Sequence, residues 1–319
     1  MEIKRKFSKL FLIYMLIILL ILYSNSYFST IKICKAIESN IIFVGGSGDK
    51  NYSKIQEAID DSNENDTIIV FEGIYNESIV INKSINLIGL NKNNVSINGN
   101  DSLYVFLIKS SYANLSGFTI QGGKIGIFLS GPEFNYNNFS GNNISNNTEG
   151  IRFVNTSNNS IFNNTIQSDY NFGIVLYGSC NNNISENFLI NNDKSIFLNK
   201  WSNNNIIQKN NLTENKKAVS LDFSFYNLIS ENYIGNNTIG VYLTNSLINN
   251  ITNNHIEFNK DCGIFISNSD DNLISSNIFL KNNQDIKLDT EPPELKAPGF
   301  EFCLFFVAIL LFLCLKKYF

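Results

Sequence analysis

Apolar and polar positions alternate in a repeating pattern between residues 137 and 288. Each unit reads Asn-x-apolar-x-x-Asn-x-apolar, and a small residue and an apolar-x-apolar stretch follow it. The two Asn positions of the unit recur together at intervals of 22 or 23 residues, which indicates a solenoid or an array. The first column contains Asn137, Asn159, Asn182, Asn205, Asn227, Asn249 and Asn272, and the second contains Asn142, Asn164, Asn187, Asn210, Asn232, Asn254 and Asn277.

The apolar residues inside each unit are spaced two apart, which is the period of a β-strand. A unit is too short for two packed helices, and it contains three such apolar pieces, for example Ile161, Ile166 and residues 174–176. Three short strands per unit predict an all-β fold, the coil of a parallel β-helix. Stacked coils should each add about 4.8 Å of length.

The two Asn columns are expected to point inward at bends of the coil. Equivalent residues of stacked coils lie above one another, so one carboxamide can donate to the carbonyl of the next and satisfy backbone groups freed by the bend. Asparagine also tolerates the left-handed backbone that tight bends need. We therefore interpret all these residues as a structural ladder rather than as a binding site.

Residues 41–66 are predicted to cap the first coil. Residues 41–44 suggest a strand, and residues 52–61 suggest a short helix with Ser53 as its N-cap and with Ile55, Ala58 and Ile59 on one face. A solenoid needs such a cover because its terminal coil would otherwise expose apolar core and open strand edges.

The helix at residues 55–59, followed by the stretch NDTIIVFEGIYNESIVINKSINLIG, resembles the opening of the right-handed parallel β-helix proteins of the pectin-lyase-like superfamily. The resemblance is greatest to the NosD-like branch, also described as the carbohydrate-binding and sugar-hydrolase repeat, and it covers residues 41–289. A unit before the first regular one places Ala113 and Phe118 at the Asn positions. About ten coils are expected.

Both ends of the chain carry expected targeting segments. Lys4, Arg5, Lys6 and Lys9 precede an apolar run, so residues 1–36 are predicted to be a signal peptide or an N-terminal anchor. Residues 290–297 form a polar linker with prolines. Residues 298–319 begin with Pro-Gly-Phe, continue as an apolar run and end with lysines. This tail resembles the archaeal PGF-type sorting signal, which implies processing and membrane attachment, and the alternative is a plain transmembrane tail anchor.

The amino-acid composition limits the partners and the kinds of site that the chain can have. The net charge of −4 implies no nucleic acid partner. The chain has one histidine, His255, and two methionines near its start, so no metal site and no cofactor are predicted. Cys180 and Cys262 fall in different phases of the repeat and should be free thiols.

Catalytic residues are not predicted either. Hydrolases of this fold use several carboxylates at close range, and lyases use acidic calcium ligands with an Arg or Lys base. The coils offer one arginine, Arg152, and no carboxylate pair that recurs on one face. The available aspartates are Asp169, Asp193, Asp222, Asp261, Asp270 and Asp271.

One outward column suggests a ligand-binding face. Between the inward residues of the third strand lie Phe128, Arg152, Val175, Phe197, Ser220, Tyr242, Phe265 and Lys287. Exposed aromatic rings on a flat sheet can stack on sugars or form a protein contact, so Phe197, Tyr242 and Phe265 are the candidate ligand-binding residues. The alternative is that another segment or molecule covers them, or that they reflect strand propensity.

Together these features predict a non-catalytic, membrane-anchored protein of an archaeal cell surface, secreted and acting in the envelope by binding or as structure. The expected partners are a polysaccharide or surface glycan and envelope or surface-layer proteins. Frequent Asn-x-Ser/Thr sequons, such as those at Asn163 and Asn236, predict glycosylation. The alternatives are a polysaccharide lyase, hydrolase or epimerase on the same scaffold, and a NosD-like copper delivery protein, for which ligands are lacking.

Overall fold

The computed structural model describes residues 39–167 and 171–289. The predicted signal segment, linker and C-terminal sorting signal therefore lie outside the described residues, as does Asp169.

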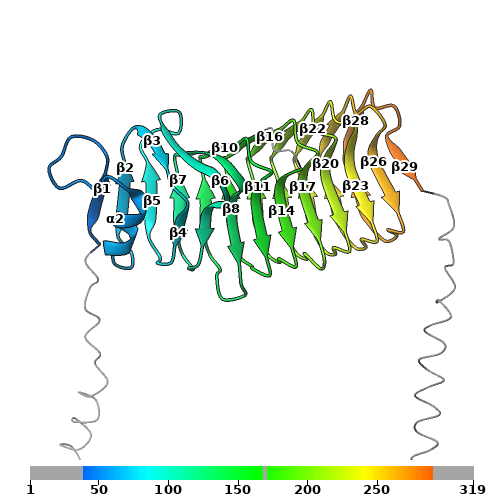
Figure 1. Ribbon diagram of the computed structural model, residues 1–319. Helices are drawn as coiled ribbons and strands as arrows, with labels where there is room; N and C mark the ends of the chain where they lie inside the picture. Colours follow the sequence, from blue (N-terminus) through cyan, green and yellow to red (C-terminus); the bar gives the residue numbers. More distant parts are fainter. Residues whose placement is uncertain (1–38, 168–170, 290–319) are drawn as a thin grey trace, which may run out of the picture. The chain divides into compact units, whose positions relative to one another are not determined.

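Three parallel sheets form the walls of the coil, which confirms the predicted parallel β-helix (Figure 1). The first sheet has eleven strands, and each pairs in parallel with the equivalent strand of the next coil. In order they are β1 (Ile41–Val44), β2 (Thr67–Val70), β5 (Asn86–Gly89), β7 (Asn114–Ser116), β9 (Asn138–Ser140), β12 (Ser160–Phe162), β15 (Asn183–Ser185), β18 (Ile206–Gln208), β21 (Leu228–Ser230), β24 (Asn250–Thr252) and β27 (Leu273–Ser275).

The second and third sheets share two long strands, β6 (Val95–Ile108) and β8 (Thr119–Ser130), whose halves belong to different sheets. The other strands of the second sheet are β3 (Gly73–Asn76), β10 (Asn143–Ser145), β13 (Thr165–Gln167), β16 (Phe188–Ile190), β19 (Asn211–Thr213), β22 (Tyr233–Gly235), β25 (His255–Glu257) and β28 (Ile278–Leu280). Those of the third sheet are β4 (Ile79–Ile81), β11 (Glu149–Val154), β14 (Phe172–Tyr177), β17 (Lys194–Asn199), β20 (Lys217–Asp222), β23 (Ile239–Thr244), β26 (Cys262–Ser267) and β29 (Ile286–Leu288).

The first sheet has one strand more than the expected ten coils. The extra turn is β1, which pairs in register with β2 and thus begins the stack, although the sequence suggested only a cap there.

The core is a bundle of columns in which one residue per coil lies above the next. In the first sheet the inward column is fully buried from β2 to β24, whereas its end members Ile42 and Ile274 are partly buried. Each fully buried side chain contributes about 1.5–3 kcal/mol of hydrophobic stabilisation. The fully buried part of the column consists of Ile68, Leu87, Leu115, Phe139, Ile161, Ile184, Ile207, Ile229 and Ile251. Since the partners of every residue come from neighbouring coils, no single coil can be stable alone.

The Asn residues of both columns lie inside the coil and are hydrogen-bonded along the stack. Asn187 donates from its backbone nitrogen and its Nδ2 to Oδ1 of Asn210, at 2.9 and 3.0 Å. Asn210 makes the same pair of bonds to Asn232. At the start of the ladder, the backbone nitrogens of Ala113 and Phe118 donate to Oδ1 of the first Asn in each column.

Two further ladders escaped the sequence reasoning. A third buried Asn column, five residues after the second, continues from Asn192 through Asn215, Asn237 and Asn259 to Asn282. A hydroxyl column three residues before the first Asn accepts backbone N–H bonds, as Ser202 Oγ does from Ser179 at 3.1 Å. Polar ladders therefore line several bends of each coil.

The bends themselves use left-handed backbone. The residue before the first Asn has a positive φ in successive coils, such as 59° at Asn158, 56° at Asn181 and 57° at Asn204. Asparagine accepts this conformation at little cost, which explains part of the Asn richness of the chain.

The helix α2 (Ile55–Asp61) covers the N-terminal end of the stack and buries Ile55, Ala58 and Ile59 (Figure 1). It is shorter than predicted, and Ser53 does not cap it. The carboxylate of Glu77 instead accepts from the backbone nitrogens of Ile55 and Gln56 at 2.9 and 3.0 Å. A carboxylate at this position satisfies two unpaired donors and favours the positive end of the helix dipole.

Candidate functional site

The outward face of the third sheet carries the column predicted from the sequence. The strand registers place Arg152, Val175, Phe197, Ser220, Tyr242 and Phe265 beside one another on consecutive strands. Val175 and Ser220 are nevertheless buried, at 3% and 1% exposure, although they were expected to be outward and accessible. Larger side chains flank both residues and shield them from solvent. An outward position in the strand alternation is therefore not always accessible on this face.

The aromatic rings of this face are directed toward one another. The rings of Tyr242 and Phe265 stack with their centroids 4.9 Å apart and their planes within 2°, and those of Phe172 and Phe197 stack at 5.5 Å. The first separation equals about one coil step, so the ring planes lie across the stacking direction. The expectation that Tyr242 presents a free flat face to a sugar is therefore not met, because Phe265 covers one side of the ring.

Two lysines contact these aromatic rings. The ammonium of Lys217 lies 3.3 Å from the ring centroid of Tyr242, and that of Lys194 lies 4.1 Å from the centroid of Phe197. Lys194 and Lys217 are register partners on β17 and β20. Such cation–π contacts hold a charged group in place, more strongly where water is partly excluded. The result is two lysines on neighbouring coils, each with its ammonium group against an aromatic ring.

Neither lysine takes part in an ion pair of this face, although the charge of Asp193 lies close enough to Lys217 to oppose the lowering of its pKa. In the described part of the chain these pairs join Lys216 to Asp193 at 3.1 Å, Lys287 to Asp261 at 2.9 Å and Arg152 to Glu149 at 2.6 Å, and they include neither Lys194 nor Lys217. Burial lowers the pKa of Lys217, and the like charge of Lys194 lowers it further. Both observations describe a positive site whose charge would be stabilised by an incoming anion.

A polar groove of about 700 Å³ follows the bend beside these lysines. Lys216 and Lys260 bring two further positive charges to it, and Glu214 brings one negative charge. The other lining residues are Asn191, Asn215, Asn236 and Thr238. The groove thus carries both signs of charge, since Lys216 is paired with Asp193 and Glu214 lies in the same lining as Lys260.

A buried carboxyl group lies at the other end of the same face. Glu149 is 7% exposed and forms an ion pair with Arg152 at 2.6 Å, while its Oε2 has no hydrogen-bond partner. Burial raises the pKa of Glu149, although the charge of Arg152 opposes this shift. No sequence pattern pointed to Glu149, because the residue occurs at this position in only one coil.

The raised pKa of Glu149 predicts a pH-dependent change in stability. The folded chain favours the protonated carboxyl, so its contribution is complete below a pH of about 4.5 and is lost as the pH rises through the higher folded pKa. Glu149→Gln should therefore gain stability relative to the parent between pH 4.5 and pH 7. Thermal unfolding at both pH values measures this, with the exposed Glu231→Gln as control. A relative loss at the higher pH would contradict it.

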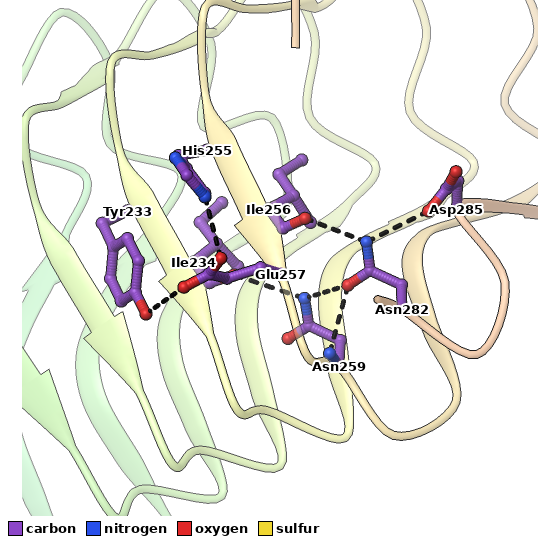
Figure 2. A network of polar contacts seen from close by, with 8 residues as sticks. All are labelled: Tyr233, Ile234, His255, Ile256, Glu257, Asn259, Asn282 and Asp285. Carbon is purple, nitrogen blue, oxygen red and sulfur yellow. Dashed lines mark hydrogen bonds and ion pairs between the residues drawn. The ribbon is translucent and has the colours of Figure 1, made fainter. Parts of the chain in front are cut away.

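The single histidine belongs to a polar network on the second sheet (Figure 2). Glu257 accepts from the hydroxyl of Tyr233 at 2.6 Å and lies 2.9 Å from Nε2 of His255. The hydrogen bond from Tyr233 lowers the pKa of Glu257, and the contact with His255 acts in the same direction. His255 is a half-exposed surface residue, as the sequence suggested, but its pairing with Glu257 was not foreseen.

Metal ligands and cysteine thiols are the remaining groups that could carry chemistry in the described part of the chain. Within residues 39–167 and 171–289, no three His, Cys, Asp or Glu side chains gather where they could hold a metal ion. Cys180 and Cys262 are free thiols, as predicted, and burial raises the pKa of Cys262 to about 11. A thiol with that pKa is a poor nucleophile at neutral pH.

Two protein-family profiles match the chain. The profile described as "Right handed beta helix region" matches residues 77–224, and that described as "Periplasmic copper-binding protein (NosD)" matches residues 166–295. With the observed parallel coils, these matches support a right-handed β-helix.

A sequence relative is a "Cell surface glycoprotein" of Methanothermus fervidus. It is 41% identical over 110 residues, which are 33% of this chain and 17% of that protein. The chain therefore spans only a small part of that relative's length.

Solved structures share the fold at low identity. The Dettilon tailspike protein (gp208) is 14% identical with a TM-score of 0.59, and the match covers 72% of this chain and 53% of that one. The A-module of the mannuronan C-5 epimerase AlgE6 of Azotobacter vinelandii is 12% identical with a TM-score of 0.54, and the match covers 75% and 95% of the two chains.

Within the residues that the structure describes, no helix has both the length and the apolar character needed to cross a membrane.

Proposed function

Starting from the finding that the chain is a right-handed β-helix protein, we propose that it is a non-catalytic cell-surface protein that binds an anionic glycan. The outward face of the third sheet is the binding surface. Lys194 and Lys217 bind carboxylate or sulfate groups of the polymer, and Phe197, Tyr242 and Phe265 hold the lysines in position.

The proposed location is supported by the relative from Methanothermus fervidus, which is described as a cell surface glycoprotein. We propose that residues 1–36 direct export and that residues 298–319 attach the protein to the membrane, as their sequences predict. The sequons at the exposed Asn163 and Asn236 are proposed glycosylation sites, since both lie at bends that leave the carboxamide accessible.

The lysine pair is the observation that carries the proposal. Lys194 and Lys217 lie on neighbouring coils, each with its ammonium group against an aromatic ring, and neither takes part in the ion pairs of the face. Charged groups along a polymer can meet such regularly spaced partners, and the aromatic edges between them offer apolar contact. The stacked rings argue for charge recognition in place of sugar stacking on the face of Tyr242.

Binding of dextran sulfate, compared with unmodified dextran, tests the proposal because the two polymers differ only in charge. Calorimetric titration of the full chain in mild detergent should detect binding of dextran sulfate alone, and raising the NaCl concentration to 0.5 M should weaken it. The net charge of −4 makes unspecific attraction to a polyanion unfavourable. Equal binding of both polymers, or binding of neither dextran sulfate nor polygalacturonate, would reject the anionic site.

A polysaccharide-modifying enzyme is the second candidate, and Glu149 favours it. A buried carboxyl with a raised pKa beside an arginine is suited to proton transfer. Glycosidic hydrolysis usually needs a second carboxyl within about 5–10 Å. A polysaccharide whose reducing ends increase with the parent but not with Glu149→Gln would establish this alternative. Copper delivery is supported less, because His255 and Glu257 provide two ligands where a site of three or more is usual.

A further inference from the structure

One corner of the β-helix carries large apolar side chains in three consecutive coils. It is the bend that joins the third sheet to the first, and it follows β17, β20 and β23. The residues are Trp201, Phe223, Phe225, Tyr226, Leu247 and Ile248, and together they are called the apolar corner. Trp201, Phe223, Tyr226 and Ile248 are 64%, 46%, 57% and 48% exposed. The apolar corner is therefore directed toward solvent and does not belong to the core.

The same bend is polar in the coils on either side. The first Asn column aligns the bends, because Asn182, Asn205, Asn227, Asn249 and Asn272 are bonded in sequence along the stack. The residues of the apolar corner lie four, two or one positions before these asparagines. Those positions hold Gly178, Cys180 and Asn181 in the coil before the corner, and Asn268, Asp270 and Asp271 in the coil after it. An apolar patch with a polar border marks an interaction surface.

The apolar corner is retained although its backbone suits other residues. Tyr226 and Ile248 have a φ of 57°, the value that Asn204 has at the equivalent position of the previous coil. Phe223 has a φ of 47°, and its equivalent Asn245 has 49°. This left-handed backbone suits asparagine and is unfavourable for bulky or β-branched residues. Since these side chains are exposed, burial does not compensate for the strain, and such strain gathers at functional sites.

The chemistry of the apolar corner fits hydrocarbon better than sugar. Leu247 and Ile248 have no ring that could stack on a sugar. The rings of Trp201 and Phe225 are inclined to each other by 46°, with their centroids 5.7 Å apart, so they form no flat platform. Tryptophan and tyrosine are enriched where a membrane meets water, and phenylalanine and leucine enter the boundary of the acyl chains. This combination is typical of a surface that inserts into a lipid interface.

The described chain ends at this same corner. The backbone nitrogen of Asp289, the last described residue, donates to the carbonyl of Ile266 at 2.8 Å and so brings the third sheet to the bend. Two coil steps, or about 10 Å, separate it from Thr244, where the bend of the third apolar coil begins. The eight residues 290–297 can span at most about 30 Å before residues 298–319. A bilayer that holds residues 298–319 therefore lies within reach of the apolar corner.

We propose that the apolar corner inserts into the surface of a lipid bilayer. Its side chains enter the interface to a depth of about 5–10 Å. The contact is separate from the proposed glycan-binding face, and it rests on the proposed membrane attachment of residues 298–319, which brings the corner to the bilayer. A second contact, several coils away from the attachment, holds the β-helix along the membrane instead of upright on it.

Trp201 tests the contact directly because it is the single tryptophan of the chain. The full chain is reconstituted into vesicles of phosphatidylcholine with brominated acyl chains, since bromine quenches tryptophan fluorescence at short range. Relative to vesicles without bromine, the emission of Trp201 should lose about half of its intensity, because the ring would lie near the acyl chains. The emission should also lie further to the blue than that of the same chain in vesicle-free detergent.

The test variant combines Phe223→Asn with Ile248→Asn and should lose most of the quenching. The matched control combines Phe162→Asn with Phe258→Asn, which removes two side chains of 37% and 41% exposure from other parts of the coil, and it should keep the quenching. The test variant should fold, because asparagine occupies the equivalent bend positions at Asn204 and Asn245. Its urea midpoint should equal or exceed that of the parent, since the left-handed backbone is relieved.

Flotation of the vesicles separates this proposal from the proposed attachment. A chain that does not float with them would overturn both, whereas a floating chain with unquenched Trp201 would overturn the apolar corner alone. Equal quenching in the parent and the test variant, loss of quenching in the control, or a lower urea midpoint of the test variant would also overturn it. A change in Trp201 emission with dextran but not with vesicles would assign the corner to a sugar instead.

Discussion

Replacing Asn210 with leucine is expected to lower the free energy of unfolding by about 3 kcal/mol. Oδ1 of Asn210 accepts two bonds from Asn187, and its Nδ2 donates to the carbonyl of Ile184 at 2.9 Å and to Asn232 at 3.0 Å. Leucine fills the space but leaves the buried backbone N–H of Asn187 without its acceptor and removes one donor from the carbonyl of Ile184. Leaving buried polar groups unpaired is costly, whereas the loss of an exposed hydrogen bond is not.

Asn211→Leu is the matched control, since Asn211 is the next residue, is exposed and points outward. Its effect should stay within about 0.5 kcal/mol. Urea unfolding followed by circular dichroism compares the two variants with the parent. If Asn210→Leu unfolded at the same urea concentration as Asn211→Leu, the amide ladder would not stabilise the coil stack.

Removing both Lys194 and Lys217 as alanines is expected to weaken dextran sulfate binding about 100-fold, which corresponds to about 2.7 kcal/mol. Each substitution removes one charge-assisted contact with the polymer, and each such contact, partly exposed to water, is expected to contribute about 1.4 kcal/mol, near the low end of the usual range. Because Lys217 has a lowered pKa and lies beside a like charge, its removal should not destabilise the fold.

The double change of Lys50 and Lys209 to alanine removes the same net charge from positions outside the third-sheet face and serves as the control. It should retain binding within about a factor of two. Calorimetric titration of both variants separates the effect of position from that of net charge. Equal weakening in the two variants would show that the protein responds to overall charge and has no defined site.

The repeat made the arrangement of the coils predictable. Residues one period apart must share an environment in a stack, so the phase of Asn187 and Asn210 relative to the apolar residues was enough to place them inside. The third ladder could have been found in the same way, because Asn192, Asn215 and Asn237 keep the same intervals.

Contacts that do not repeat could not be predicted from the periodicity. The capping of α2 by Glu77 joins residues 22 positions apart, and local sequence favoured Ser53. The site depends on side-chain torsions, which a period does not determine. Alternation placed Tyr242 on the outer face, but only the fold shows that its ring stacks on Phe265 and supports Lys217.

The ladders also make one coil interchangeable with another. Each Asn column gives and receives the same bonds at every step, so deleting or duplicating 22 or 23 residues within residues 137–288 would leave an unbroken ladder. The number of coils can then change during evolution with little cost at the junction, as nearest-neighbour energetics allow. A longer descendant would gain its added surface in steps of about 4.8 Å, and it could carry new outward residues without altering the interior.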